Sequence, residues 1–299
     1  MLLVLATAAI GLAWPAPGEA LSGYVTPLLA LLMLCVSLTF DLAALKAVLA
    51  RPGVQALATV LVYGPMSLAA HALGRLVFGQ VPLGLGMTLV GTLPTDVSSP
   101  LLVWLARGNV ALATVLNAVN TALAPFLVPA LFLLLTGVDL EAPVGDLILE
   151  LAVTVLVPTA IGVAVRTWQP ARVAPVEPVL STTSSLAYLA LLLAVVGPNA
   201  DAILDAPADM ARVAAAALAL NAFGYLVAFV AWPLVRERAD RTAMLFTVSK
   251  KEFSIAAFVV FASGLPEAVA LPAVVYAVVQ MVTSPLVARF MARRAESVA

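Results

Sequence analysis

Long apolar runs separated by short polar or charged segments occupy almost the whole chain. A helix that crosses a bilayer needs about 20 mostly apolar residues. Such runs, rich in Leu, Ala and Val and without the alternation of a barrel strand, predict transmembrane helices. Ten of them are bounded by charge, Pro or Gly, at residues 1–14, 24–44, 54–78, 83–106, 110–135, 146–166, 179–197, 208–235, 242–263 and 266–290.

The first run, 1–14, is short and has no Lys or Arg before its apolar core. A secretory signal peptide normally begins with such a charge. We therefore expect a first span whose start is missing or lies partly in the membrane interface. A signal peptide remains the alternative.

Composition places the chain in the same environment. Of its 299 residues, 63% are hydrophobic and 10% are charged, and the mean hydropathy is +1.11. Soluble domains are about half apolar and roughly a quarter charged, so a water-soluble fold is excluded. The net charge of -1 gives no basic surface for nucleic acid. We expect residues 1–299 to form a single transmembrane domain whose partner is the lipid bilayer.

Basic residues predict how the helices are oriented. With the N-terminus in the cytoplasm, only Arg75 and Arg212 fall in outside segments, against eleven basic residues in cytoplasmic ones. By the positive-inside rule, this predicts a multi-pass protein of the cytoplasmic membrane with both termini in the cytoplasm. The cytoplasmic set is Lys46, Arg51, Arg107, Arg166, Arg172, Arg236, Arg238, Arg241, Arg289, Arg293 and Arg294.

Two of the predicted spans are interrupted by polar sequence. The fourth contains GTLPTDVSSP at 91–100, where Pro94 and Pro100 each remove a backbone N–H and clash with the preceding turn. The ninth contains TVSKKEFS at 247–254, which has no Pro or Gly, so a break in its backbone is less strongly indicated. Because lipid does not tolerate irregular backbone, both segments are expected to line a wet cavity enclosed by protein.

The two interruptions occupy matching positions in the two halves of the chain. Each lies in the fourth span of a group of five, in residues 1–140 and in residues 141–299. Five is odd, so the halves insert in opposite orientations. This predicts an all-α fold of two inverted five-helix repeats with two broken, crossing helices, an arrangement that places a transporter's binding site near the bilayer midplane.

Four ionisable residues lie inside these spans: Asp96 in the fourth, and Lys250, Lys251 and Glu252 in the ninth. An ion at the bilayer centre costs at least about 2.5–3.5 kcal/mol on insertion scales, so such groups are kept mainly where they have partners. Asp96 is predicted to be the counter-ion of one lysine, with a helix cap as the alternative. Each lysine either pairs permanently or acts in transport, by replacing a bound sodium, binding a substrate carboxylate or carrying a proton.

Further candidates for substrate or ion binding are polar residues at the two breaks and on the fifth and tenth spans. Those on the fifth and tenth spans are equally explained by hydrogen bonds between helices. With a single cysteine, Cys35, and a single histidine, His71, neither a metal site nor a cofactor is expected. The further candidates are Ser98, Ser99, Asn117, Asn120, Thr121, Thr247, Ser249, Ser254 and Gln280.

The sequence from Gly91 to Phe132 resembles the bile acid:sodium symporter family. The stretch is GTLPTDVSSPLLVWLARGNVALATVLNAVNTALAPFLVPALF, in which LARGNVAL precedes a polar helix with two prolines. SLTFDLAALKAVLARP, KKEFSIAAFVV and AVVYAVVQMVTSPLVARF extend the resemblance over nearly the whole chain. It implies ten spans in inverted repeats, a core and a panel domain, and alternating access. It also implies an organic-anion substrate, such as a bile acid, a sulfo-conjugate or a small keto acid.

The sodium ligands that the resemblance implies are largely replaced. Ser99 precedes Pro100 where the family has Asn, and Val62 stands where it has Gln. Lys250 and Lys251 lie where the ninth-span ligands are expected, and an ammonium group repels sodium. Strict sodium coupling is therefore not expected, and proton coupling is the alternative.

These observations favour a secondary active transporter of a small organic anion of the carboxylate or sulfonate type. The alternative is a cation/proton antiporter with the same inverted-repeat architecture, which a buried Asp–Lys pair would suit. An enzyme would need a nucleophile–base pair or a metal set, and the sequence contains neither near the interface. A sensor would need a soluble output domain, for which the chain has no segment long enough.

Overall fold

The computed structural model describes residues 2–40, 52–138 and 143–296, with the backbone alone from 294. Every regular element in these ranges is a helix. The first half contains α1 (Leu2–Ala13), α2 (Ala16–Ser22), α3 (Val25–Ser37), α5 (Pro52–Tyr63), α6 (Pro65–Phe78), α7 (Pro82–Thr92), α8 (Ser99–Leu105) and α9 (Val110–Thr136). The second half contains α10 (Val144–Trp168), α11 (Pro170–Val173), α12 (Glu177–Val196), α13 (Ala200–Asp205), α14 (Pro207–Val230), α15 (Arg238–Ser249), α16 (Phe253–Ala262) and α17 (Leu271–Glu296).

Within the described ranges, six helical stretches are long and apolar enough to cross a bilayer. Each coincides with one predicted span, and α1 with α2, bent by 101°, makes a seventh if the pair is counted as one. The remaining predicted spans fall on α3 and on the short helix pairs α7–α8 and α15–α16. The six are Pro52–Phe78, Val110–Thr136, Val144–Trp168, Pro170–Val196, Pro207–Leu234 and Glu267–Arg293.

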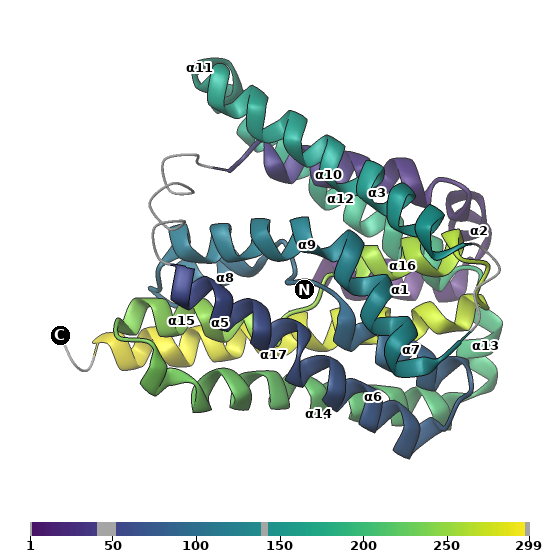
Figure 1. Cartoon of the computed structure of the whole chain (residues 1–299). Coiled ribbons are helices and arrows are strands. Elements are labelled where there is room, and N and C mark those ends of the chain that lie inside the picture. The colour runs from purple at the N-terminus through teal and green to yellow at the C-terminus, as the bar shows by residue number, and fades with distance from the viewer. Residues whose placement is uncertain (1, 41–51, 139–142, 297–299) are drawn as a thin grey trace.

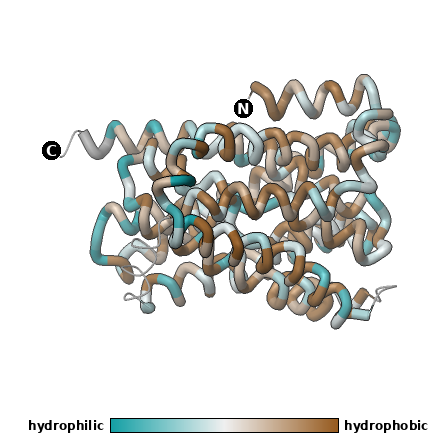
Figure 2. Tube along the Cα trace, turned by 90° about the horizontal axis from the view of Figure 1, so that it is seen from above, coloured by the Kyte–Doolittle hydropathy of each residue, from teal (hydrophilic) through white to brown (hydrophobic). Residues whose placement is uncertain are grey.

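An all-helical, multi-pass membrane fold is therefore confirmed, whereas the count of ten and the inverted repeat stay predictions. Figure 2 shows the hydrophobic colour running along the helices, while the hydrophilic colour gathers toward their ends. This distribution is expected when the middle of each helix faces hydrocarbon or other helices and its ends reach the polar interface.

The helices pack in two layers (Figure 1). In the panel layer, α3 packs against α10 and α12, and α12 also packs against α1 and α2. The core layer is made of α5 to α9 and α14 to α17, which pack mainly among themselves. α16 contacts α3 and α12 as well as α17, so the second half of the ninth span lies at the boundary between the layers.

The third predicted span, 54–78, is bent rather than continuous. α5 ends at Tyr63 and α6 begins at Pro65, which has no N–H to donate to the preceding turn. The far end of α7 packs closely on α6 at Gly91, where a Cβ would lie 2.4 Å from Cβ of Ala70 and 2.8 Å from the carbonyl oxygen of Met66. Glycine at this position therefore allows the C-terminal end of α7 to approach the bend.

The predicted orientation can be tested with reporter fusions. A reporter placed after Gly137 should be outside the cell and one placed after Val235 should be inside, because basic residues concentrate in the predicted cytoplasmic segments. Matching signals at the two positions would contradict the topology. Of the basic residues behind this prediction, Lys46, Arg51 and the side chain of Arg294 lie outside the described residues.

Candidate functional site

The fourth span is broken, as its two prolines predict. Residues 93–98 between α7 and α8 are not helical, and Leu93 is extended at φ -65° and ψ 151°. Pro94 lies in this segment, while Pro100 lies in the first turn of α8, where its missing N–H costs no helical bond. The break is shorter than the predicted 91–100, because the helices on both sides extend into the polar sequence.

The ninth span is also broken, although it contains neither Pro nor Gly. α15 ends at Ser249, and Lys250 (φ -111°, ψ 140°) and Glu252 (φ -86°, ψ 96°) are extended before α16 begins. Carbonyl and N–H groups freed from a helix inside a membrane need other partners. The position of this break therefore depends on what the surrounding helices supply.

Side chains of α14 and α17 supply those partners. The carbonyl of Ser249 accepts hydrogen bonds from Asn221 Nδ2 (2.8 Å) and from the Tyr276 hydroxyl (2.7 Å). Gln280 pairs with the backbone of Lys251 in both directions: its Oε1 accepts from the N–H (2.9 Å), and its Nε2 donates to the carbonyl (3.0 Å). Tertiary contacts thus replace the helical bonds that the break removes.

The two breaks cross and are bonded to each other. The N–H of Glu252 donates to the carbonyl of Pro94 (3.0 Å), and Glu252 Oε2 accepts from the N–H of Val97 (3.0 Å). The Thr95 hydroxyl donates to the carbonyl of Thr247 (2.9 Å). Residues about half a chain apart therefore form one connected site.

A fully buried ion pair lies at this crossing. Lys250 Nζ is 2.9 Å from Asp96 Oδ1, and both side chains are 0% exposed. Ser98 joins them: its hydroxyl accepts from Lys250 and donates to Asp96, and its N–H donates to the same carboxylate (2.8 Å). Gln280 Nε2 donates to the other carboxylate oxygen (3.1 Å). Asp96 is thus the counter-ion of Lys250, and through the N–H of Ser98 it also caps the local turn.

Lys251 has a different environment. Its ammonium donates to three backbone carbonyls, those of Val62 (2.7 Å), Gly91 (2.8 Å) and Leu93 (2.9 Å). It also lies 6.0 Å from the centre of the Tyr63 ring. The two adjacent lysines therefore point into separate sites, as residues that are neighbours in sequence are expected to do.

On α9, one of the three predicted residues connects to the crossing. Asn120 Nδ2 donates to the Thr95 hydroxyl (3.1 Å), while its Oδ1 accepts from Thr59 (2.9 Å). Asn117 and Thr121 bond to each other instead (3.2 Å). Asn117 is buried, and its amide nitrogen has no hydrogen-bond partner among the described residues.

The four remaining hydroxyl candidates take local or supporting positions. Ser254 donates to Glu252 Oε1 (2.6 Å) at the start of α16. Ser99 donates to a backbone carbonyl of α15 (3.3 Å) and so joins the two broken spans. The hydroxyls of Thr247 and Ser249 donate to carbonyls one turn earlier in their own helix, so these two residues contribute to the crossing through their backbone.

A cavity of about 450 Å³ adjoins the ion pair, between the panel layer and the crossing. Ser98, which contacts both Lys250 and Asp96, forms part of its wall. Its polar lining consists of hydroxyl groups, and no charged side chain of the described residues lines it. The lining residues are Leu3, Val4, Leu32, Cys35, Val36, Thr39, Val97, Ser98, Leu101, Ser181, Ser184, Ser185, Tyr188, Leu189 and Met281.

Tyr188 is a cavity residue that the sequence analysis missed. It is 8% exposed, and its hydroxyl is buried within electrostatic reach of Asp96 and beside the Gln280 amide. That hydroxyl nevertheless has no hydrogen-bond partner of normal geometry among the described residues. The sequence contains only a general signal for this wall, the run of five hydroxyl residues STTSS at 181–185, of which Ser181, Ser184 and Ser185 line the cavity with Tyr188.

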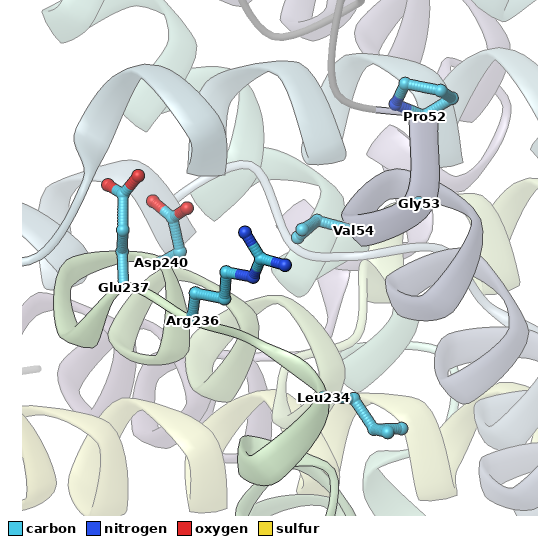
Figure 3. Close-up of a pocket in the computed structure, with 7 residues that line it drawn as sticks. All are labelled: Pro52, Gly53, Val54, Leu234, Arg236, Glu237 and Asp240. Atoms are coloured by element: carbon cyan, nitrogen blue, oxygen red, sulfur yellow. The ribbon is translucent and has the colours of Figure 1, made fainter.

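A second pocket, of about 370 Å³, lies where the start of α5 meets the segment leading into α15. Figure 3 shows Arg236 extending toward Val54, with the carboxylates of Glu237 and Asp240 on its other side. Asp240 accepts a hydrogen bond from Asn109 Nδ2 (2.8 Å), which joins the loop before α9 to α15. No residue of the crossing lines this pocket, so the cavity beside the ion pair is the better candidate for a binding site.

Comparisons with known proteins identify the family to which the chain belongs. Residues 1–293 match the SBF-like CPA transporter family. The chain is 24% identical, over 97% of its length and 90% of the relative's, to a Bacillus subtilis (strain 168) protein named as an uncharacterized sodium-dependent transporter, YocS. It is 29% identical, over 58% of its length and 43% of the relative's, to the probable sodium/metabolite cotransporter BASS1 of Oryza sativa subsp. japonica. The resemblance to bile acid:sodium symporters is thereby confirmed, and the chain belongs to the SBF-like CPA transporter family of membrane transporters.

Proposed function

We propose that this protein is a secondary active transporter that moves a small organic anion, of the carboxylate or sulfonate type, across the cytoplasmic membrane. Alternating access would follow from movement of the panel layer relative to the crossing, because the cavity lies between them. A displacement of one layer against the other would open the cavity first to one side and then to the other.

The observation that carries this proposal is that Ser98, which is bonded to both Lys250 and Asp96, forms part of the cavity wall. A volume of about 450 Å³ is within the usual range for a small-molecule site. Hydroxyl groups can donate hydrogen bonds to an anion, and the apolar part of the lining suits an organic body. An incoming carboxylate or sulfonate would accept from the Ser98 hydroxyl once that group turns from Asp96 toward the cavity. It would also share the Lys250 ammonium, whose hydrogen bonds to Asp96 and Ser98 use two of its three N–H donors, in a charge-assisted hydrogen bond of the stronger kind.

The second candidate is a cation/proton antiporter of the same architecture, and the buried Asp96–Lys250 pair is the observation that favours it. A cation would have to displace the ammonium and take over the carboxylate. Against this, the Asp96 oxygens already accept from Lys250, Ser98 and Gln280, and the cavity lining has no carboxylate of its own among the described residues. An anion requires a smaller change, because the Ser98 hydroxyl would only have to turn from Asp96 toward the cavity while the Lys250–Asp96 pair stays in place.

The experiment that separates these functions is uptake into proteoliposomes across a panel of labelled carboxylates and sulfonates, with pH gradients imposed separately. Saturable uptake of at least one organic anion is the expected result. If no anion is taken up, while sodium or potassium collapses an imposed pH gradient only in protein-containing vesicles, the antiporter is correct instead.

Uptake should not require sodium. Replacing sodium with choline at constant pH and ionic strength should leave the initial rate unchanged within experimental scatter, because Lys250 and Lys251 carry positive charge at the crossing where a coupling cation would sit. The names of the relatives YocS and BASS1 refer to sodium, so the test has a clear alternative outcome. A steep dependence of uptake on sodium concentration would contradict this prediction.

A further inference from the structure

The ammonium of Lys251 lies in a ring of backbone oxygens that the proposed function does not use. The carbonyls of Val62, Gly91 and Leu93 converge on Nζ at 2.7, 2.8 and 2.9 Å. All three N–H donors of the ammonium are therefore satisfied by carbonyls. The described residues include no carboxylate within ion-pair distance of Nζ.

The carbonyls of this ring come from the C-terminal ends of two helices. Val62 lies in the last turn of α5, and Gly91 and Leu93 lie at the end of α7. The last carbonyls of a helix have no intrahelical partner and carry about half a negative charge in total. The bend at Pro65 and the close packing at Gly91 bring both ends to the same point.

Converging carbonyl oxygens are the ligands with which proteins replace the hydration shell of a monovalent cation. We infer that these three carbonyls form a monovalent-cation site in which the side chain of Lys251 is the permanent, covalently attached occupant. The Lys251 ammonium fills the ring in this structure, so no dissolved cation is needed to hold the ends of α5 and α7 together.

The inference predicts that shortening Lys251 creates a site for a dissolved cation. Lys251→Ala removes the ammonium and its stem but leaves the carbonyls, so a small cation and water can enter the space. The oxygens lie 2.7–2.9 Å from the nitrogen, a spacing that suits ammonium and potassium better than the smaller sodium ion. Choline is too large to enter.

The experiment measures the melting temperature of purified Lys251→Ala in chloride salts of ammonium, potassium, sodium and choline at equal ionic strength. A cation present at about 100 times its Kd should raise the melting temperature by roughly 5 °C relative to choline. The expected order is ammonium and potassium first, then sodium, with a saturable dependence on concentration. Stability is the readout, so the result does not depend on whether the transport proposal is correct.

Two controls make the test specific. Lys251→Met loses the same charge but keeps an apolar stem that blocks the route to the ring, so its melting temperature should not distinguish the salts. The unaltered protein should not distinguish them either. The inference is overturned if Lys251→Ala melts at the same temperature in all four salts, if Lys251→Met responds equally, or if Lys251→Ala cannot be obtained folded even when purified in ammonium chloride throughout.

Discussion

Lys250→Met should lower the free energy of unfolding by about 3–5 kcal/mol, because it leaves the Asp96 carboxylate buried without its counter-ion. Asp96→Asn should be damaging for the reciprocal reason, since it leaves an ammonium without its anion. The double change Asp96→Asn with Lys250→Met removes both charges and should be more stable than either single variant. Melting temperatures in detergent measure all three.

The double variant is not expected to recover completely. Gln280 Nε2 donates to Asp96 Oδ2 and is held by the backbone of Lys251, so an amide group at position 96 cannot satisfy every donor around it. The result that matters is the coupling between the two changes. Strictly additive losses in stability would show that Asp96 and Lys250 do not stabilise each other. That result would contradict the ion pair between these two residues.

Tyr188→Phe should weaken binding of the anion without lowering the stability of the protein. The ring packs edge-on against Phe253 at 4.6 Å, and this contact survives the change. The hydroxyl is buried and has no hydrogen-bond partner of normal geometry among the described residues, so removing it should leave the melting temperature unchanged or raise it. If that hydroxyl donates to the bound anion, its loss should raise KM roughly tenfold or more, the value of a hydrogen bond to a charged group.

Tyr225→Phe is the matched control for this change. Its hydroxyl bonds to Ser284 Oγ (2.9 Å), and it does not line the cavity. Removing it should lower the melting temperature and leave KM for the anion unchanged. An unchanged KM in Tyr188→Phe, or equal KM effects in the two variants, would remove Tyr188 from the substrate site.

Much of the helical architecture could be predicted from the apolar runs, since six predicted spans coincide with long helices. Pro94 identified the break in the fourth span because the lack of a proline N–H is a local property of the sequence. The bend at Pro65 follows from the same property, but it was overlooked within an apolar run. The break after Ser249 has no such signal, because its stability comes from Asn221, Tyr276 and Gln280, which are distant in sequence.

The candidate site was likewise predicted only in part from the sequence. The sequence placed four ionisable residues inside the spans and predicted that Asp96 pairs with one of the two lysines, but it did not determine which lysine. Which lysine pairs with Asp96 depends on how the breaks of the fourth and ninth spans cross, and these breaks are about half the chain apart. The ring of carbonyls around Lys251 could not be predicted from the sequence, because every residue has a backbone carbonyl and no residue type marks the ones that converge. Tyr188 was missed because the position of its hydroxyl, which has no partner of normal geometry in the part of the chain that the structure describes, depends on packing between layers.

The proposed transport depends on the buried Lys250 ammonium, which lies behind Ser98 of the cavity wall, receiving an organic anion without the help of sodium. The most direct test compares anion uptake by the unaltered protein and by the double variant Asp96→Asn with Lys250→Met, both reconstituted in sodium-free liposomes. We expect saturable uptake by the unaltered protein and none above background by the folded double variant. Full uptake by the double variant, or uptake by the unaltered protein only after sodium is added, would contradict it.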